Sequence, residues 1–174
     1  MVDLTLLQSV SYIAGALGVC VAAFYYVITL RTTLQTRNAQ IMMDIFDKWN
    51  WDKIFQVNSW KFNNVDEFMG IFNEDTMEKG KIFNDVFAVY EETGVLLHEN
   101  LIDIRPIARG FGGFYKGQWE KWEPYIKHQR VVWKSPRDWI EAEYFYDRLM
   151  RFARDNPEYR ILEHETAMPV ITKS

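Results

Sequence analysis

Cysteine is nearly absent from this sequence, because the chain of 174 residues contains only Cys20. A single cysteine excludes a disulfide framework and any zinc site built from several cysteines. It is also typical of a domain kept in the reducing cytoplasm. Basic runs are absent too: 20 Lys and Arg stand against 24 Asp and Glu, giving a net charge of −4. We therefore expect no nucleic-acid partner, since such binding requires a basic patch or stripe.

Charge is missing altogether from residues 4–30, which contain no Asp, Glu, Lys, Arg or His. As a helix this segment is about 40 Å long, whereas about 20 residues suffice to cross a bilayer core. A secretory signal peptide would have a basic start and a shorter apolar run, but this chain begins Met-Val-Asp. A buried core helix of a soluble protein is the other alternative, and such a helix usually carries polar residues along one side. The segment therefore predicts a transmembrane anchor, residues 1–30, solvated by the lipid bilayer.

The flanks of the anchor predict its orientation. No Lys or Arg precedes it, whereas Arg31 and Arg37 follow it. The positive-inside bias then places the C-terminal side in the cytoplasm, with Tyr25 and Tyr26 near that membrane interface. We expect a single-pass protein of the cell membrane with its N-terminus outside and its C-terminal domain cytoplasmic.

Small residues recur within the anchor at intervals of three and four positions. Such a face lets a second helix approach closely, which is how membrane helices associate without a hydrophobic driving force. The pattern favours packing against another membrane helix or membrane protein, with a homo-oligomer as one form of it. Coincidence is the alternative, because Gly and Ala are common in membrane helices. The expected packing residues are Ser11, Ala14, Gly15, Gly18 and Ala22.

Glycine and proline are both absent from residues 19–69, so nothing forces the anchor helix to stop at the membrane surface. Apolar residues at helical spacing predict that it continues to about Trp49. The rest of the chain predicts an all-α fold, in which the transmembrane helix continues into a small cytoplasmic bundle of about four helices. We place the cytoplasmic helical domain at residues 31–157 and an irregular C-terminal tail at residues 158–174.

Start signals locate the later helices. Residues 50–73 predict a loop with a short helix at 65–72, and Asp75 then opens a capping-box pattern for the helix that follows. Asn100 or Asp103 is expected to cap the next helix, which runs to about residue 123, with a kink at Pro124 before Tyr125 to Val132. The sequence Ser135-Pro136-Arg137-Asp138 is the clearest start signal and predicts the last helix.

Catalytic motifs are missing from the domain. The three histidines, His98, His128 and His164, lie on different expected elements, and none completes the Glu-x-x-His pair of a di-metal bundle. The Gly110-Phe111-Gly112-Gly113 run has no preceding strand and no following Lys-Ser or Lys-Thr, so it favours helix packing over phosphate binding. We therefore predict no catalytic residue, no metal site and no cofactor.

Aromatic residues are abundant, at 16% of the chain with seven tryptophans. They indicate a well-packed core or an aromatic contact surface. Facing carboxylates on the preceding helix make this region the best candidate for a pocket or contact face, although burial in the core is the ordinary role of such residues. The candidate residues are Glu91, Glu92, Phe111, Tyr115, Trp119 and Trp122.

Several segments together carry a resemblance. They are Arg37-Asn38-Ala39, the Phe87 to Leu97 stretch with Glu91 and Glu92, Leu101-Ile102-Asp103, and Trp119 through Arg130. In their order, the chain resembles a loosely defined group of uncharacterised prokaryotic proteins with one N-terminal span and a helical domain of unknown function. The likeness covers most of the chain and implies this architecture without an activity.

Three functions follow from these features. The first is a non-catalytic, membrane-anchored interaction module or accessory subunit of a membrane assembly. The second is a membrane-tethered ligand sensor or enzyme with a pocket in the aromatic-rich helices. The third is a signalling relay that uses the long helix. The small-residue face and the missing catalytic motifs favour the first.

Overall fold

The computed structural model describes residues 4–163, and all of its regular elements are helices. The chain divides into two compact units, Met1–Ile41 and Met42–Ser174. Helix α1, Leu4–Lys48, makes up the described part of the first unit and contributes its last turns to the second. The expected all-α fold with a long N-terminal helix is confirmed. The last residues of the expected tail, 164–174, lie outside the described part.

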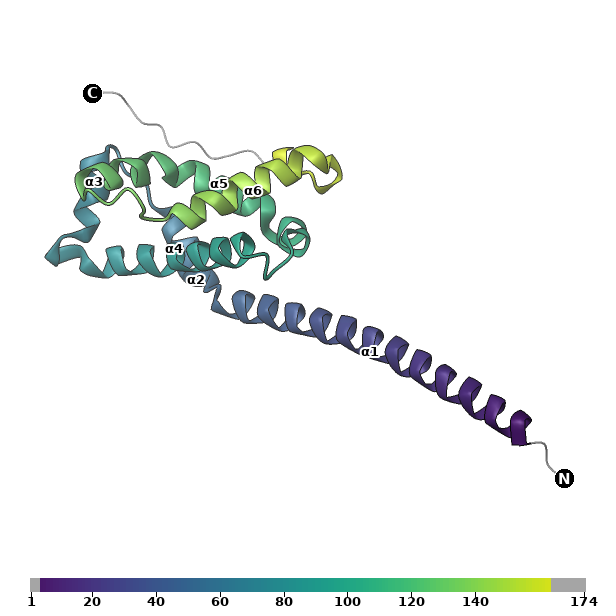
Figure 1. The fold of residues 1–174 in the computed structure, drawn as a ribbon. Helices are drawn as coiled ribbons and strands as arrows, with labels where there is room; N and C mark the ends of the chain where they lie inside the picture. The colour runs from purple at the N-terminus through teal and green to yellow at the C-terminus, as the bar shows by residue number, and fades with distance from the viewer. Residues whose placement is uncertain (1–3, 164–174) are drawn as a thin grey trace. The chain divides into compact units, whose positions relative to one another are not determined.

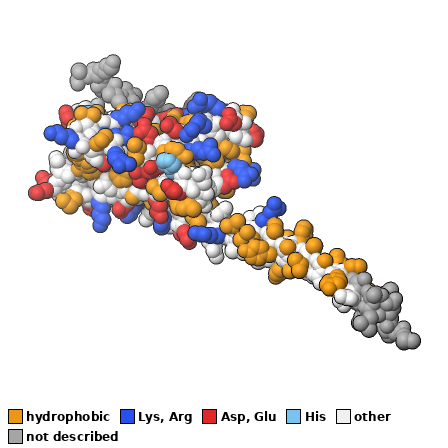
Figure 2. All heavy atoms as spheres, viewed as in Figure 1, with side chains coloured by type: hydrophobic (Ala, Val, Ile, Leu, Met, Phe, Trp, Pro, Cys, Tyr) orange, Lys and Arg blue, Asp and Glu red, His pale blue; other side chains and the backbone are white. Residues whose placement is uncertain are grey.

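The first unit is an exposed apolar helix. Every described side chain from Val10 to Gln40 is exposed, including Tyr25, Tyr26, Arg31 and Arg37. This helix is long and apolar enough to cross a membrane, and no part of its apolar window is buried. Figure 2 shows hydrophobic side chains along it, whereas charges of both signs are mixed over the visible face of the second unit.

The second unit is a cluster of helices (Figure 1). After α1 come α2 (Trp51–Ser59), α3 (Val65–Met69) and two 3-10 turns, η1 (Gly70–Phe72) and η2 (Glu74–Thr76). Three longer helices follow, α4 (Met77–His98), α5 (Ile104–Val132) and α6 (Ile140–Asp155). The turns η3 (Pro157–Tyr159) and η4 (Ile161–Glu163) end the described chain, and Ile161 is buried.

Helices α4, α5 and α6 hold the core. Helix α4 packs most extensively against α6, and α5 packs against α6 as well. The largest fully buried side chains are aromatic, among them Tyr90, Trp119 and Trp122. Their burial stabilises the fold because each large ring removes much apolar surface from water.

One glycine allows the closest approach of two helices. A Cβ atom built on Gly94 of α4 would lie 1.9 Å from the backbone oxygen of Glu141, at the start of α6. Only a residue without a side chain fits there. By contrast, nothing lies within 4 Å of a Cβ built on Gly110 or Gly117, so those glycines of α5 serve no such contact.

Two local expectations were wrong, and one helix runs unbroken past the expected end of its first part. Helix α2 occupies part of the expected loop, and Asn50 caps it by accepting a hydrogen bond from the Lys53 backbone N–H. Helix α5 continues through Pro124 to Val132. Helix α6 begins at Ile140, because residues 135–139 form a turn in which the Ser135 hydroxyl bonds the Asp138 carboxylate. The Asp103 cap was predicted correctly, since its side chain accepts from the Arg105 backbone N–H.

Candidate functional site

A hollow lined by charged, amide and indole side chains lies beside α4 in the second unit. The residues of α4 that line this hollow recur at helical spacing and include two carboxylates. Helix α5 contributes one buried amide, and the connection to α6 contributes two indoles. This hollow of about 540 Å³, here called the Gln129 hollow, is lined by Asn84, Asp85, Ala88, Glu91, Gln129, Trp133, Arg137, Asp138 and Trp139.

The connection between α5 and α6 shapes one wall of the Gln129 hollow. Trp139 has φ 57° and ψ 30°, a left-handed conformation that is unusual for a bulky residue. Arg130 fixes the residue before it, because its Nε donates to the Asp138 carbonyl at 2.8 Å. The same guanidinium pairs with Glu143 of α6 at 2.6 Å. Arg130 therefore ties the connection to both helices.

Glu91 links the hollow to the start of α6. Its Oε2 accepts a hydrogen bond of 2.8 Å from the Ala142 backbone N–H. Burial raises the pKa of the Glu91 carboxyl above its ordinary value, and this bond offsets the rise in part. Tyr115 of α5 reaches the same residue, because its hydroxyl donates to the Ala142 carbonyl at 2.6 Å. Ala142 thus receives one contact from each neighbouring helix.

Two buried polar atoms of residues lining the hollow have no hydrogen-bond partner within the described chain. They are Oε1 of Gln129 and Nε1 of Trp139. Gln129 is 1% exposed, so solvent does not reach most of its side chain. A buried acceptor without a donor destabilises the fold by about 1–3 kcal/mol. Six other buried polar atoms of the described chain are unpartnered as well, among them Gln118 Oε1, so this feature does not by itself mark a ligand site.

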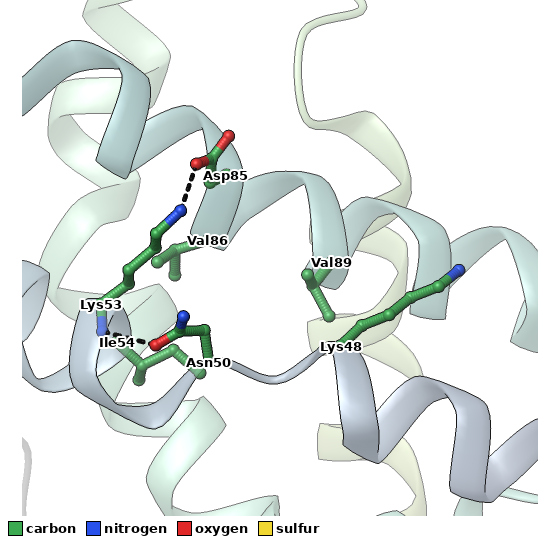
Figure 3. A pocket seen from close by; sticks show the side chains of 7 residues that line it. All are labelled: Lys48, Asn50, Lys53, Ile54, Asp85, Val86 and Val89. Atoms are coloured by element: carbon green, nitrogen blue, oxygen red, sulfur yellow. Dashed lines mark hydrogen bonds and ion pairs between the residues drawn. The ribbon is translucent and has the colours of Figure 1, made fainter. Parts of the chain in front are cut away.

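A second, smaller groove lies between α4 and the start of α2 (Figure 3). It measures about 200 Å³ and shares Asp85 with the Gln129 hollow. Figure 3 shows the Lys53 ammonium directed at the Asp85 carboxylate, 2.6 Å away. Lys48 pairs with Glu92 at 2.5 Å. Because each lysine already has a carboxylate partner, this groove leaves no strong binding group unused. Its lining residues are Lys48, Asn50, Lys53, Ile54, Asp85, Val86 and Val89.

The candidate residues expected from the sequence occupy three different places. Glu91 lines the Gln129 hollow, and Glu92 pairs with Lys48. Tyr115 stacks on Phe145 with ring centres 3.9 Å apart, and it is fully buried. Trp119 and Trp122 are buried in the core as well, and Phe111 packs against Trp49 at 4.9 Å.

Sequence reasoning missed Gln129, Trp133 and Trp139. The one sequence signal for them was the Ser135-Pro136 pair, which indicates a break between two helices with a tryptophan on each side of it. We interpreted this pair as the start of a helix and therefore did not predict that the two tryptophans line a hollow.

Residues expected to pack in the membrane all lie on α1. Ser11, Ala14, Gly15, Gly18 and Ala22 are exposed, and nothing lies within 4 Å of a Cβ built on Gly15 or Gly18. Cys20, also on this helix, is exposed. Within residues 4–163, no three His, Cys, Asp or Glu residues are grouped so as to hold a metal ion.

Comparison with known proteins yields one relationship. No curated protein and no solved structure matches the chain. The model of a family described as a domain of unknown function, DUF4760, matches residues 12–149. This match includes most of α1 and all of α2 to α5, together with the Gln129 hollow. The chain therefore belongs to the DUF4760 family.

Proposed function

We propose that this chain is a single-pass protein of the cell membrane that acts without catalysis, as an interaction module or accessory subunit of a membrane assembly. Its N-terminus lies outside and its helical domain in the cytoplasm. Lipid and another membrane helix surround α1 in this arrangement.

One observation carries the proposal. The large apolar side chains of α1 between Val10 and Leu30 are exposed, with exposed fractions from 48% for Leu30 to 71% for Tyr12. An apolar surface of this extent is not stable in water and marks a site covered by lipid or protein. The alternative is that α1 is a core helix of a soluble domain. That alternative is not supported, because none of the apolar part of α1 is buried.

The small-residue face supports a partner helix. Gly15 and Gly18 leave open space beside the α1 backbone, which is where close helix contact forms in membranes. Gly18→Ile should block that contact, whereas Ala16→Ile places the same side chain about 200° around the helix. Both variants keep the anchor apolar, so Ala16→Ile is the matched control.

The experiment is chemical crosslinking in native membranes, followed by mild detergent extraction and purification. We expect a crosslinked adduct for the wild type and for Ala16→Ile, and its loss for Gly18→Ile. An adduct with twice the mass of the chain would assign the partner as a second copy. A monomer in all three samples, or equal adduct yields, would contradict the proposal.

Orientation has its own test. In a Cys20→Ser background, Lys79→Cys supplies a single thiol at an exposed position of α4. An impermeant maleimide should label this thiol in inside-out vesicles and leave it unlabelled in sealed right-side-out vesicles. The opposite result would reverse the proposed orientation.

A membrane-tethered ligand sensor is the second candidate. A hollow of about 540 Å³ lined by the Glu91 carboxylate and two indoles favours it. This volume lies within the range typical of small-molecule sites, about 300–1,000 Å³. A sensor would respond to its ligand with a change in the crosslinked adduct, which the first candidate does not require.

A further inference from the structure

The end of α5 and the turn after it form an exposed tip of the second unit. Three apolar side chains follow one another there, with exposed fractions of 76% for Val131, 50% for Val132 and 43% for Trp133. Lys134 and Arg137 come next in the chain and are exposed as well. Residues 131–137, here called the α5 tip, therefore present apolar and basic side chains to the surroundings.

Backbone hydrogen bonds fix the conformation of the α5 tip. The Ser135 N–H donates to the Arg130 carbonyl at 3.0 Å, and the Lys134 N–H donates to the Val131 carbonyl at 3.3 Å. This pair of bonds is the Schellman motif, in which the residue after the helix cap is left-handed and usually glycine. Here that residue is Lys134, with φ 53°, a conformation that is unfavourable for a residue with a side chain. The chain therefore places a cation at the tip despite a conformational cost.

The exposed charge of the α5 tip is positive. Residues 124–137 contain four Lys and Arg residues and no Asp or Glu. Two of the four are held in ion pairs with glutamates, whereas Lys134 and Arg137 form no ion pair with any described residue. The carboxylates of Asp138 and Glu91, which line the hollow beside the tip, are half-buried and accept hydrogen bonds from the chain. The two cations are therefore available to an anionic partner.

An anionic lipid surface matches both properties of the α5 tip. Tryptophan favours the layer between lipid headgroups and acyl chains, and burial of the valine side chains there removes apolar surface from water. One Lys or Arg near an anionic membrane strengthens binding by a factor of about five. Three apolar side chains are too few to bury about 800 Å² on one side of a protein interface, the usual area for a stable complex. Lipid, by contrast, requires no complementary shape.

From these features we infer that the α5 tip binds the anionic surface of a lipid bilayer. The side chains of Val131, Val132 and Trp133 enter the headgroup layer, and Lys134 and Arg137 lie among the lipid phosphates. This contact goes beyond the proposed anchor, because it involves the helical domain and depends on the charge of the lipid. It rests on the proposed function for one condition: α1 keeps the domain near a bilayer, so that weak binding by the tip suffices.

The test follows a fluorophore on the tip of the full-length chain in reconstituted vesicles. In a Cys20→Ser background the fluorophore is attached to Val131→Cys, and in a control to Glu99→Cys, an exposed position at the C-terminal end of α4. Vesicles of phosphatidylcholine, with or without phosphatidylglycerol, contain a lipid with a nitroxide quencher near its headgroup. We expect phosphatidylglycerol to increase quenching of the tip fluorophore by about fivefold or more and to leave the control unchanged. Equal quenching of the tip in both kinds of vesicle would overturn the inference.

Lys134→Gly separates lipid binding from folding. Glycine is favoured in the left-handed conformation, so this variant should unfold at the same temperature as the wild type or higher. It removes one cation, so the ratio of lipid-bound to free tip in phosphatidylglycerol vesicles should fall by about fivefold.

Arg160→Gly is the matched control for Lys134→Gly. Arg160 is also basic, exposed and left-handed, with φ 55°. The next residue, Ile161, lies against Gly112, which is about 28 Å along α5 from the tip. We expect Arg160→Gly to retain the tip quenching of the wild type. Undiminished quenching in Lys134→Gly, or an equal loss in both variants, would contradict the inference.

Two further measurements distinguish a second copy of the chain from lipid, and the tip from the anchor. A disulfide dimer of unlabelled Val131→Cys in either kind of vesicle would assign the tip to a second copy and overturn the inference. Carbonate extraction of the same vesicles tests α1 by itself. Extraction of a chain whose tip is quenched would contradict the spanning helix and support the lipid contact. Retention of a chain whose tip is not quenched would support the anchor and overturn the inference.

Discussion

At the scale of single residues, Gly94 leaves no room for a side chain. A Cβ there would lie 1.9 Å from the Glu141 backbone oxygen, which belongs to the start of α6. Gly94→Ala should therefore displace α6 and lower the free energy of unfolding by about 1–3 kcal/mol, as overpacked positions do. Thermal unfolding in mild detergent measures the loss.

Gly110→Ala is the control for Gly94→Ala. It changes the same residue type within a helix at a position with nothing inside 4 Å. Because alanine favours the helix over glycine, this variant should be stabilised by about 0.5–1 kcal/mol. Equal effects at the two positions would mean that α4 and α6 do not approach as described.

Lys121 should make the free energy of unfolding depend on pH in the alkaline range. Burial lowers the pKa of its ammonium to about 8, although it donates to the Trp60 carbonyl at 2.9 Å and to the Asn58 carbonyl. Between this value and about 10.4, the ordinary pKa of lysine, the unfolded chain binds more protons than the folded one. The contribution of Lys121 to the free energy of unfolding should therefore rise with pH over that interval.

The measurement is thermal unfolding at pH values from 7 to about 10, for the wild type and Lys121→Met. The variant should lose the alkaline rise, whereas Lys81→Met, on the exposed side of α4, should keep it. Above pH about 10 the sign reverses, because burial raises the pKa of the Tyr90 and Tyr115 phenols. An identical pH profile for wild type and Lys121→Met would contradict this account.

At the scale of elements, the connection between α5 and α6 depends on Arg130. This side chain bonds the Asp138 carbonyl and Glu143, so Arg130→Met leaves both without their donor. We expect the free energy of unfolding to fall by about 1–3 kcal/mol and amide exchange at the start of α6 to accelerate. Arg137→Met, on an exposed residue of the same connection, should stay within about 0.5 kcal/mol of wild type. Unchanged exchange in Arg130→Met would show that the connection is held by other contacts.

The elements also show how far the sequence predicts the fold. The long helix α1 and the helices α4 and α5 follow from apolar spacing and from a local cap at Asp103, so they were predicted. Helix α2 was missed because it is short, with nine residues, and tertiary contacts of its buried Ile54 and Val57 hold it. Lys121, which is distant in sequence, donates to the carbonyls of Asn58 and Trp60 at the C-terminal end of α2.

The candidate site was harder to predict for the same reason. Glu91 was identified because a carboxylate on this helix was expected to face the aromatic residues of the next one. Gln129 and Trp139 became neighbours of Glu91 only through the turn at residues 135–139, whose left-handed Trp139 no local propensity favours. The residues after Ser135 do form a turn, but the Ser135 hydroxyl donates a hydrogen bond to the Asp138 carboxylate and does not cap a helix.

At the scale of the whole molecule, the proposed function requires α1 to cross a membrane. One charge near the middle of a membrane span raises the free energy of insertion by about 2.5–3.5 kcal/mol. Ala16→Arg should therefore reduce the fraction of the chain that resists carbonate extraction. Gln40→Arg adds the same charge beyond the uncharged segment and should have little effect. Equal retention of both variants would count against a spanning helix.

The most direct measurement uses Cys20, the one thiol of the chain, which lies within the proposed span and is exposed on α1. Sealed native membranes are treated with an impermeant maleimide, with and without prior solubilisation in denaturing detergent. If lipid surrounds α1, Cys20 remains unlabelled in intact membranes and reacts fully after solubilisation. Rapid labelling in intact membranes, or recovery of the full-length chain in the soluble fraction without detergent, would contradict the account.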